Sequence, residues 1–349
     1  MKRVLLSIML VLCANIFVCY SKNNGVKESS TKDSIALFPA RENGKYGYIN
    51  KEGKFVIDPQ FDLAGRFSEG LASVRIGDEE TGKYGYINKA GQFVINPQFD
   101  DAWFFSEGLA RVSIGGKYGY INKAGKFVIN PKFDGASDFS EGLARVSIGD
   151  GQTGKFGYIN KAGKFVINPQ FDGASDFSEG LARVSIGGKY GYINKAGQFV
   201  IKPQFDYAWS FSEGLAMVSI GGKYGYINKA GQFVINPKFD GATWSFSEGL
   251  AGVRIGDWRT GKWGYINKEG KFVINPKFDG AGDFSEGLAM VSIGGKHGYI
   301  NKTGKIVINP QFDATLSFSE GLAMVMVGDF ITGKYGYINK EGKIVYMEK

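Results

Sequence analysis

Short stretches with alternating apolar and polar positions recur along the chain from residue 35 to its end. In residues 143–148 (LARVSI), for example, the apolar Ala144, Val146 and Ile148 occupy every second position. Successive side chains of a strand point to opposite faces of a sheet, so this period of two predicts a half-buried β-strand. We therefore expect an all-β chain.

Turn signals and further short strands follow each strand of this kind. Residues 181–186 repeat the sequence LARVSI, and a Gly-Gly link at Gly187 and Gly188 follows them. Such a link predicts a tight hairpin, because both positions accept a positive φ. The returning strand is 189–194, a turn of sequence NKAG comes next, and residues 198–201 (QFVI) make a third strand. One repeat is thus predicted to be a three-stranded antiparallel meander.

The meander occurs nine times. Its marker is the run Gly-Lys-aromatic-Gly-Tyr-Ile-Asn, whose copies start 34, 38 or 39 residues apart. A connector lies between consecutive meanders: a proline that ends the third strand, then Phe-Asp, a few variable residues and Phe-Ser-Glu-Gly. We expect the connector to be irregular and anchored by its two phenylalanines. The copies of the marker start at Gly44, Gly82, Gly116, Gly154, Gly188, Gly222, Gly261, Gly295 and Gly333.

Residues 35–349 are therefore predicted to form one tandem array rather than two or three separate domains. The first unit opens with residues 35–41, a diverged copy of the first strand, and the last closes with residues 342–347. A propeller often closes by sharing strands between its two ends, and no strand is left over here for sharing. The count favours an open, solenoid-like or superhelical array, with a closed, propeller-like ring as the alternative.

The repeat resembles the WG repeat family, a bacterial β-repeat also called the KWG repeat. The resemblance extends over residues 35–349, and its signature tryptophan is present only as Trp263, with Tyr or Phe in seven copies and His297 in one. We interpret this position as one where an aromatic ring packs. The resemblance implies no catalytic residue and no cofactor. The elements that carry it are clearest at 261–267 (GKWGYIN), Gly270, 273–276 (VINP) and 284–289 (FSEGLA).

The N-terminus has the pattern of a secretory signal. Lys2 and Arg3 precede a nearly apolar run at 4–18, which is shorter than the roughly 20 residues of a membrane span. We predict a signal peptide at residues 1–19, a flexible polar tether at 20–34, and export of the repeat array.

Cys19 at the end of this run resembles the acylated cysteine of a bacterial lipoprotein. Val18 departs from the small residue that usually precedes such a cysteine, and ordinary cleavage after Ser21 is the alternative. A lipid on Cys19 would hold the protein at the cell envelope, and it is the only membrane contact that we expect; without it the protein would be secreted. The other cysteine, Cys13, also lies in the signal, so the exported part has no thiol or disulfide.

Charge and titratable residues exclude several classes of function. The formal charge of +8 is spread thinly over the repeats, so we expect a solvated surface and no nucleic-acid partner. His297 is the only histidine, and it leaves no nucleophilic triad and no multi-histidine metal site. We therefore expect no enzyme, no metal and no cofactor.

Two recurrent acidic positions could carry chemistry, and we interpret both as structural. The glutamate of Phe-Ser-Glu-Gly occurs in eight equal copies, whereas an active site is a single exception, so we expect it to accept backbone N–H bonds in a turn. Four longer hairpin loops of sequence Gly-Asp-x-x-Thr-Gly supply too few oxygens for calcium. Their aspartates are Asp78, Asp150, Asp257 and Asp329.

Positions that differ between near-identical repeats are where specificity can reside. Two places vary: the connector after Phe-Asp, and the tips of the four long loops. Large aromatic residues gather there, and an exposed one wastes apolar area unless it packs locally or meets a partner. Packing and ligand contact both stay open for the connector residues, while contact is favoured for those on the loops. The candidates are Trp103, Trp209 and Trp244 in connectors and Trp258 and Phe330 on loops.

These features predict a non-catalytic binding or interaction scaffold at the bacterial cell envelope, with a protein as its partner. The alternative is a carbohydrate- or cell-wall-binding protein that uses the same aromatic residues, because rings flanked by polar groups suit sugars and protein surfaces alike.

Overall fold

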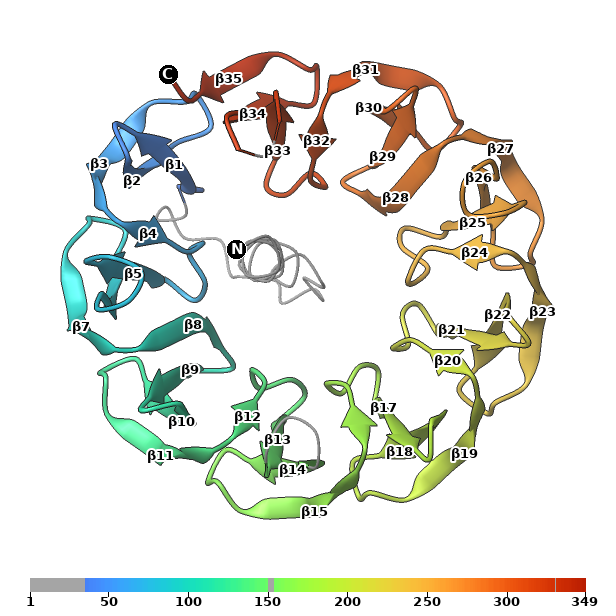
Figure 1. Ribbon diagram of the computed structural model, residues 1–349, viewed down its shortest axis with the longest axis horizontal. Coiled ribbons are helices and arrows are strands. Elements are labelled where there is room, and N and C mark those ends of the chain that lie inside the picture. The colour runs from blue at the N-terminus through green and yellow to red at the C-terminus, as the bar shows by residue number, and fades with distance from the viewer. Residues whose placement is uncertain (1–34, 150–153, 330) are drawn as a thin grey trace. The chain divides into compact units, whose positions relative to one another are not determined.

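The computed structural model of the protein describes residues 35–149, 154–329 and 331–349. Residues 36–349 form nine small antiparallel sheets arranged in a ring, as the blades of a nine-bladed β-propeller (Figure 1). The all-β prediction and the count of nine units are confirmed. Within the described ranges no helix is long and apolar enough to cross a membrane. The predicted signal peptide, the predicted tether and Cys19 lie outside the described residues.

Each blade runs outward from the ring axis in the order of its strands (Figure 1). In the part of the chain that the structure describes, only the first blade lacks an innermost strand. The innermost strands are β4 (Leu63–Ala64), β8 (Asp101–Ser106), β12 (Gly135–Ala136), β16 (Gly173–Ala174), β20 (Tyr207–Ala208), β24 (Gly241–Ala242), β28 (Gly280–Ser285) and β32 (Ala314–Thr315). The next strands are β1 (Phe38–Glu42), β5 (Ala72–Ile76), β9 (Leu109–Ile114), β13 (Leu143–Ile148), β17 (Leu181–Ile186), β21 (Leu215–Ile220), β25 (Ala251–Ile255), β29 (Leu288–Ile293) and β33 (Leu322–Val327).

The third strand of each blade contains the marker run, and the outermost strand of the first eight blades runs through the proline to the next phenylalanine. The third strands are β2 (Lys45–Ile49), β6 (Lys83–Ile87), β10 (Lys117–Asn122), β14 (Lys155–Asn160), β18 (Lys189–Asn194), β22 (Lys223–Asn228), β26 (Lys262–Ile266), β30 (Lys296–Asn301) and β34 (Lys334–Asn339). The outermost strands are β3 (Phe55–Phe61), β7 (Phe93–Phe99), β11 (Phe127–Phe133), β15 (Phe165–Phe171), β19 (Phe199–Phe205), β23 (Phe233–Phe239), β27 (Phe272–Phe278), β31 (Ile306–Phe312) and β35 (Ile344–Met347).

The connector differs from its prediction. Its first two variable residues are not irregular: they belong to the innermost strand and pair with the following strand, so eight of the nine blades have four strands instead of three. In the fifth blade, Gly173 and Ala174 of β16 pair with Ser185 and Val184 of β17. The connector therefore places its variable residues on the inner wall of the ring.

Glycines are needed where the chain turns and where strands approach closely. Gly187 and Gly188 have φ values of 56° and 75°, so the predicted two-residue hairpin between β17 and β18 is confirmed. In the marker run, a Cβ atom on Gly191 would lie 2.5 Å from the carbonyl oxygen of Ile201. The ladder between β18 and β19 shifts its register at this point, and only glycine fits there.

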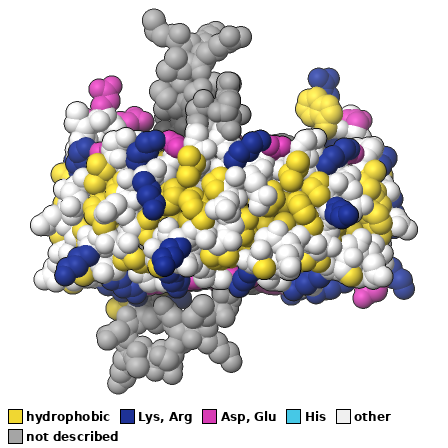
Figure 2. All heavy atoms as spheres, turned by 90° about the horizontal axis from the view of Figure 1, so that it is seen from below, with side chains coloured by type: hydrophobic (Ala, Val, Ile, Leu, Met, Phe, Trp, Pro, Cys, Tyr) yellow, Lys and Arg dark blue, Asp and Glu magenta, His cyan; other side chains and the backbone are white. Residues whose placement is uncertain are grey.

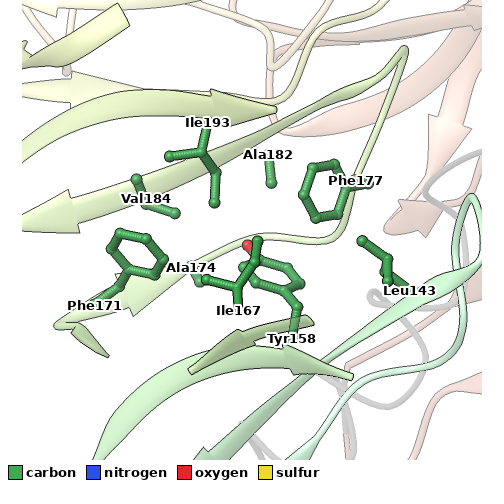
Figure 3. Packing of buried hydrophobic residues seen from close by; sticks show 9 residues of the cluster. All are labelled: Leu143, Tyr158, Ile167, Phe171, Ala174, Phe177, Ala182, Val184 and Ile193. Atoms are coloured by element: carbon green, nitrogen blue, oxygen red, sulfur yellow. The ribbon is translucent and has the colours of Figure 1, made fainter. Parts of the chain in front are cut away.

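The apolar core lies between neighbouring blades. Figure 3 shows one cluster, in which Leu143, Tyr158 and Ile167 of the fourth blade pack against Phe177 and Val184 of the fifth. Burying a large apolar side chain contributes roughly 1.5–3 kcal/mol. Because a single blade leaves one face of this core uncovered, the blades stabilise one another around the ring.

The outer rim carries a band of apolar side chains, with basic side chains along both of its borders (Figure 2). Val94 and Val128 of the outermost strands are among the exposed residues of this band. The outermost strands β7 and β11 also contain Pro97 and Pro131, which cannot donate a hydrogen bond to an added strand. The proline therefore protects the free edge of the blade.

The ring closes between the first and the ninth blade, so of the two arrangements considered from the sequence the closed ring is confirmed and the open array is not observed. Among the described residues, no strand is shared between these two blades. Closure instead rests on packing and hydrogen bonds: Phe38 lies 5.5 Å from Tyr337 between ring centroids, and Lys349 forms an ion pair of 2.6 Å with Glu42. Ala40 and Ile49 complete this interface with Tyr337.

Candidate functional site

The invariant polar residues of the repeat connect one blade to the next. Ser140 Oγ donates a hydrogen bond of 2.9 Å to the carbonyl oxygen of Phe177 in the following blade. The Glu141 carboxylate accepts a hydrogen bond of 3.0 Å from the backbone N–H of Gly180 and forms an ion pair of 3.2 Å with Lys195. Phe-Ser-Glu-Gly is thus a clamp between blades.

The structural interpretation of the glutamates is confirmed, with one difference: the N–H group belongs to the next repeat rather than to the same turn. These glutamates have φ values of 50–55°, an unfavourable backbone region for a residue with a Cβ atom, so the fold imposes this turn conformation in every connector. The glutamate–glycine pairs are Glu69–Gly108, Glu107–Gly142, Glu141–Gly180, Glu179–Gly214, Glu213–Gly249, Glu248–Gly287 and Glu286–Gly321.

A buried tyrosine from the marker run holds the connector of the next blade. Tyr86 Oη donates a hydrogen bond of 2.7 Å to the carbonyl oxygen of Trp103, and Tyr192 Oη donates one of 2.6 Å to that of Trp209. Burial raises the pKa of Tyr86 and Tyr192 far above the ordinary value, so both hydroxyls stay protonated donors. The inner wall is therefore a rigid frame with variable side chains.

The structure brings three of the predicted contact residues to this inner wall. Trp103 lies in the innermost strand β8, Trp209 directly follows β20, and Trp244 follows β24 after Thr243. Trp258 lies elsewhere, on the long loop between β25 and β26. Phe330 lies outside the described residues. The five candidates therefore do not form one site.

Trp103 is half-buried and packed within the blade. The Arg111 guanidinium lies 3.9 Å above its ring, and the ring of Tyr118 lies 5.6 Å away. The same guanidinium pairs with Asp138 of the next blade at 3.4 Å. Burial raises the pKa of Asp138, and the Arg111 charge opposes this effect. Trp103 thus contributes to a structural junction more than to an open surface.

Trp209 and Trp244 make a different arrangement, an aromatic stack across two blades. Their ring centroids are 5.4 Å apart with planes inclined by 26°, and Tyr207 stacks on the other side of Trp209 at 6.0 Å and 25°. The Arg183 guanidinium lies 5.3 Å from the Trp209 ring. Trp244 is 50% exposed and Tyr207 is 37% exposed, so the stack offers ring surface to a ligand.

A third variable position, on the second strand of the blade, was missed in the sequence reasoning. The third residue of the second strand is Arg111, Arg145 and Arg183 in three consecutive blades, and Met217, Met290 or Met324 in later ones. The arginines donate to a carbonyl oxygen of the next innermost strand, as Arg183 does to Ala208 at 2.8 Å. The alternation of LARVSI had suggested a plain solvent-facing position, but comparison of the nine copies at this position would have shown the change from basic to apolar.

Asp283, in the connector of the eighth blade, is a second half-buried carboxyl near the inner wall. Burial raises its pKa to about 6, and a hydrogen bond with the Thr243 side chain opposes the shift. Thr243 directly precedes Trp244, so this carboxyl lies beside the aromatic stack.

The long loops carry the remaining candidates. The Asp257 carboxylate accepts hydrogen bonds from the backbone N–H groups of Arg259 and Thr260 and from the Thr260 hydroxyl, which lower its pKa to about 2. Its oxygens are therefore used within the turn, as predicted. Trp258 at the tip is 72% exposed, with the Arg259 guanidinium 4.6 Å from its ring, and Ile331 on another long loop is 91% exposed.

The residues that could serve in catalysis or metal binding make structural contacts instead. His297 takes the register position of the marker aromatic in β30, half-buried, with Nδ1 3.2 Å from Met290 Sδ, and burial lowers its pKa. Among the described residues, no three His, Cys, Asp or Glu side chains come together in a group that could hold a metal ion.

Comparison with known proteins agrees with the repeat. A family model described as "WG containing repeat" matches residues 46–79, 84–118, 118–151, 156–190, 190–224, 224–257, 263–296 and 298–329. No curated protein matches the chain.

Among solved structures, the chain is similar to dihydro-heme d1 dehydrogenase NirN (12% identity, 96% of this chain and 83% of that one, TM-score 0.49). It is also similar to a quinonprotein alcohol dehydrogenase-like protein from Bacteroides thetaiotaomicron (12% identity, 94% and 95% coverage, TM-score 0.41) and to Hsv2 of Kluyvelomyces marxianus (12% identity, 80% and 95% coverage, TM-score 0.42). Because the family model matches most of residues 46–329, the chain belongs to the WG-repeat family.

Proposed function

We propose that this propeller is an exported, non-catalytic binding scaffold of the bacterial cell envelope, which takes its partner on the inner wall of the ring and on the exposed loop tips. The observation that supports this best is that recurrent and variable residues of the repeat have different places in the structure. Residues that recur in the copies are used in clamps, turns and cores, whereas the variable residues lie in the connectors, at one position of the second strands and on the long loops.

The chemistry of the frame also supports a role in binding. The recurrent carboxylates accept backbone N–H groups or pair with lysines, so they are held as structural anions and not as acids and bases poised for a substrate. The exposed rings of Trp244 and Tyr207 and the exposed side chains of Trp258 and Ile331 offer apolar area that gains from a partner.

Photocrosslinking in cells tests this function directly. A photoreactive phenylalanine analogue is placed at Tyr207 on the inner wall, at Trp258 on a loop tip, or at Val94 on the outer rim as a matched control. We expect discrete adducts from positions 207 and 258 and none from 94. Adducts from position 94 alone, or from no position, would contradict a scaffold that binds through the inner wall and loops.

Export is a separate part of the proposal. The predicted signal at residues 1–19 supports it, and fractionation of cells that express the full chain tests it. Protein that stays entirely in the cytoplasmic fraction, with its first 19 residues still attached, would contradict export.

A further inference from the structure

We propose that the stack of Trp244, Trp209 and Tyr207, together with the neighbouring Thr243 and Asp283, is a binding site for a neutral oligosaccharide. The inference deepens the proposed function and rests on it, because it names the ligand class for one part of the inner wall. It is carried by three departures from the repeat, all located at this stack.

The first departure is an inserted residue. The connector of the seventh blade reads GATWS (241–245), one residue longer than every other connector. Thr243 continues the pairing of the innermost strand, with its N–H donating a hydrogen bond of 2.7 Å to the carbonyl oxygen of Gly252. Trp244 follows as the additional bulky residue and is 50% exposed, whereas Trp103 and Trp209 in connectors of ordinary length are half-buried.

The second departure accommodates the first. Gly252 occupies the variable position of the second strand that holds arginine or methionine in six other blades. A Cβ atom there would lie 2.5 Å from the Thr243 methyl group, and the Gly252 N–H donates a hydrogen bond of 2.9 Å to the Thr243 hydroxyl. The insertion and the glycine therefore fit each other, and together they make a locally built structure.

The third departure is a buried hydroxyl that, among the described residues, lacks a hydrogen bond and so lowers stability. The Tyr226 hydroxyl is fully buried and, in the described part of the chain, has no hydrogen-bond partner, while its equivalents Tyr192 and Tyr265 donate to a connector carbonyl oxygen. A buried hydroxyl without a partner costs about 1–3 kcal/mol. Departures from good packing and hydrogen bonding that lower stability are typical of functional sites, where they are kept because the site binds a ligand.

The geometry of the stack favours a sugar. Three rings in contact form a rigid platform that loses little side-chain entropy when a ligand binds. The C–H faces of a pyranose pack on such a platform. The half-buried Asp283 carboxyl, which is held by the Thr243 side chain next to Trp244 in the chain, can exchange hydrogen bonds with sugar hydroxyls.

Other ligand classes fit less well. A cation held by aromatic rings prefers to lie over ring faces from several sides, and these rings are stacked nearly parallel. An anion would meet the Asp283 carboxyl, and the Arg183 guanidinium is already engaged with the Ala208 carbonyl oxygen and the Trp209 ring. A neutral, hydroxyl-rich ligand agrees with both observations.

Tryptophan fluorescence tests the site with cellotetraose, maltotetraose and the tetramer of N-acetylglucosamine as probes. We expect a saturable change with at least one of them, and a loss of affinity of about tenfold or more in Trp244→Ala and in Asp283→Asn. Trp258→Ala is the matched control, because it removes an exposed tryptophan on a loop and should leave the affinity unchanged. Melting curves verify that each variant is folded.

Two results would overturn the inference: no saturable change with any of the three probes, or binding that Trp244→Ala leaves intact. Saturable binding of choline or of polygalacturonate in place of the neutral probes would also overturn it and assign the stack to a charged ligand. If inner-wall photocrosslinks persist while the sugars fail to bind, the scaffold function stands and only the sugar assignment falls.

Discussion

Tyr337 donates a hydrogen bond of 3.0 Å from its hydroxyl to the carbonyl oxygen of Pro39, although the two residues are 298 positions apart in the chain. Elsewhere in the ring the equivalent tyrosine holds the innermost strand of the next blade, as Tyr192 holds Trp209. The first blade has no innermost strand, and the bond goes to β1 instead. The repeat's own blade-to-blade contact is thus adapted to close the ring.

Tyr337→Phe should lower the free energy of unfolding of residues 35–349 by about 1 kcal/mol, because the Pro39 carbonyl loses its donor. Chemical denaturation measures the change. Tyr192→Phe is the matched control, since it removes the same type of bond within the array, and it should have a similar effect. A neutral Tyr337→Phe beside a destabilising Tyr192→Phe would show that the ring is open in solution.

Tyr226→Phe should change the free energy of unfolding in the opposite direction. The Tyr226 hydroxyl is buried with no partner among the described residues, so its removal takes away a desolvation cost and no hydrogen bond. We expect the variant to be unchanged or more stable by up to about 1 kcal/mol in the same denaturation experiment. Destabilisation equal to that of Tyr192→Phe would mean that the hydroxyl has a partner.

The glutamate clamp can be isolated by comparing two blades. Glu141→Ala removes a carboxylate that accepts the Gly180 N–H and pairs with Lys195, whereas Glu320 shows no such contact among the described residues. Both have nearly the same φ, 54° and 53°, so the backbone strain of alanine is equal in the two variants. We expect Glu141→Ala to cost about 1–3 kcal/mol more than Glu320→Ala in thermal or chemical unfolding. Equal losses would show that the clamp contacts of Glu141 do not contribute to stability.

Asp283 predicts a pH dependence of stability. Its pKa of about 6 in the folded protein lies above the value of about 3.9 in an unfolded chain, so the folded state binds more protons between these values. The free energy of unfolding should therefore fall as the pH rises through this window. Asp283→Asn should flatten the fall, measured by denaturation at several pH values.

Asp176→Asn is the control for this titration, because Asp176 takes the same connector position in the fifth blade and is exposed. The raised pKa of Asp138 contributes a slope of the same sign in all three proteins and cancels in the comparison. A slope that Asp283→Asn leaves unchanged would contradict the burial effect assigned to Asp283.

Cys19→Ser tests the lipid anchor. If Cys19 is acylated, the full-length protein should sediment with membranes and the variant should move to the soluble fraction, because an acyl chain is its only predicted membrane contact. Cys13→Ser is the matched control and should leave the partition unchanged. Equal partition of the parent and Cys19→Ser would rule out the anchor.

Much of the blade could be predicted from the repeated residues. The alternation in LARVSI, the Gly187-Gly188 hairpin and the nine marker runs predicted strands, turns and unit count, because these depend on neighbours in the sequence. The connector was predicted as irregular because its variable residues have no common pattern; its pairing is made by backbone groups, which are the same for every side chain. The grouping of the aromatic candidates was not predicted: of those that the structure describes, only Trp209 and Trp244 come together, and Trp103 packs under Arg111.

The sequence by itself determined the family, the blade and the positions that vary, because a short period of apolar residues and glycines specifies local strands and turns. Only the tertiary structure decided that nine blades close into a ring and that the connectors face its axis. Closure depends on the small rotation added at each blade junction, which arises from side-chain packing such as that of Leu143 against Phe177 and is not written in any single repeat. The same packing brings Asp283 of one blade beside Thr243 of another, 40 positions earlier, and so creates the site proposed here.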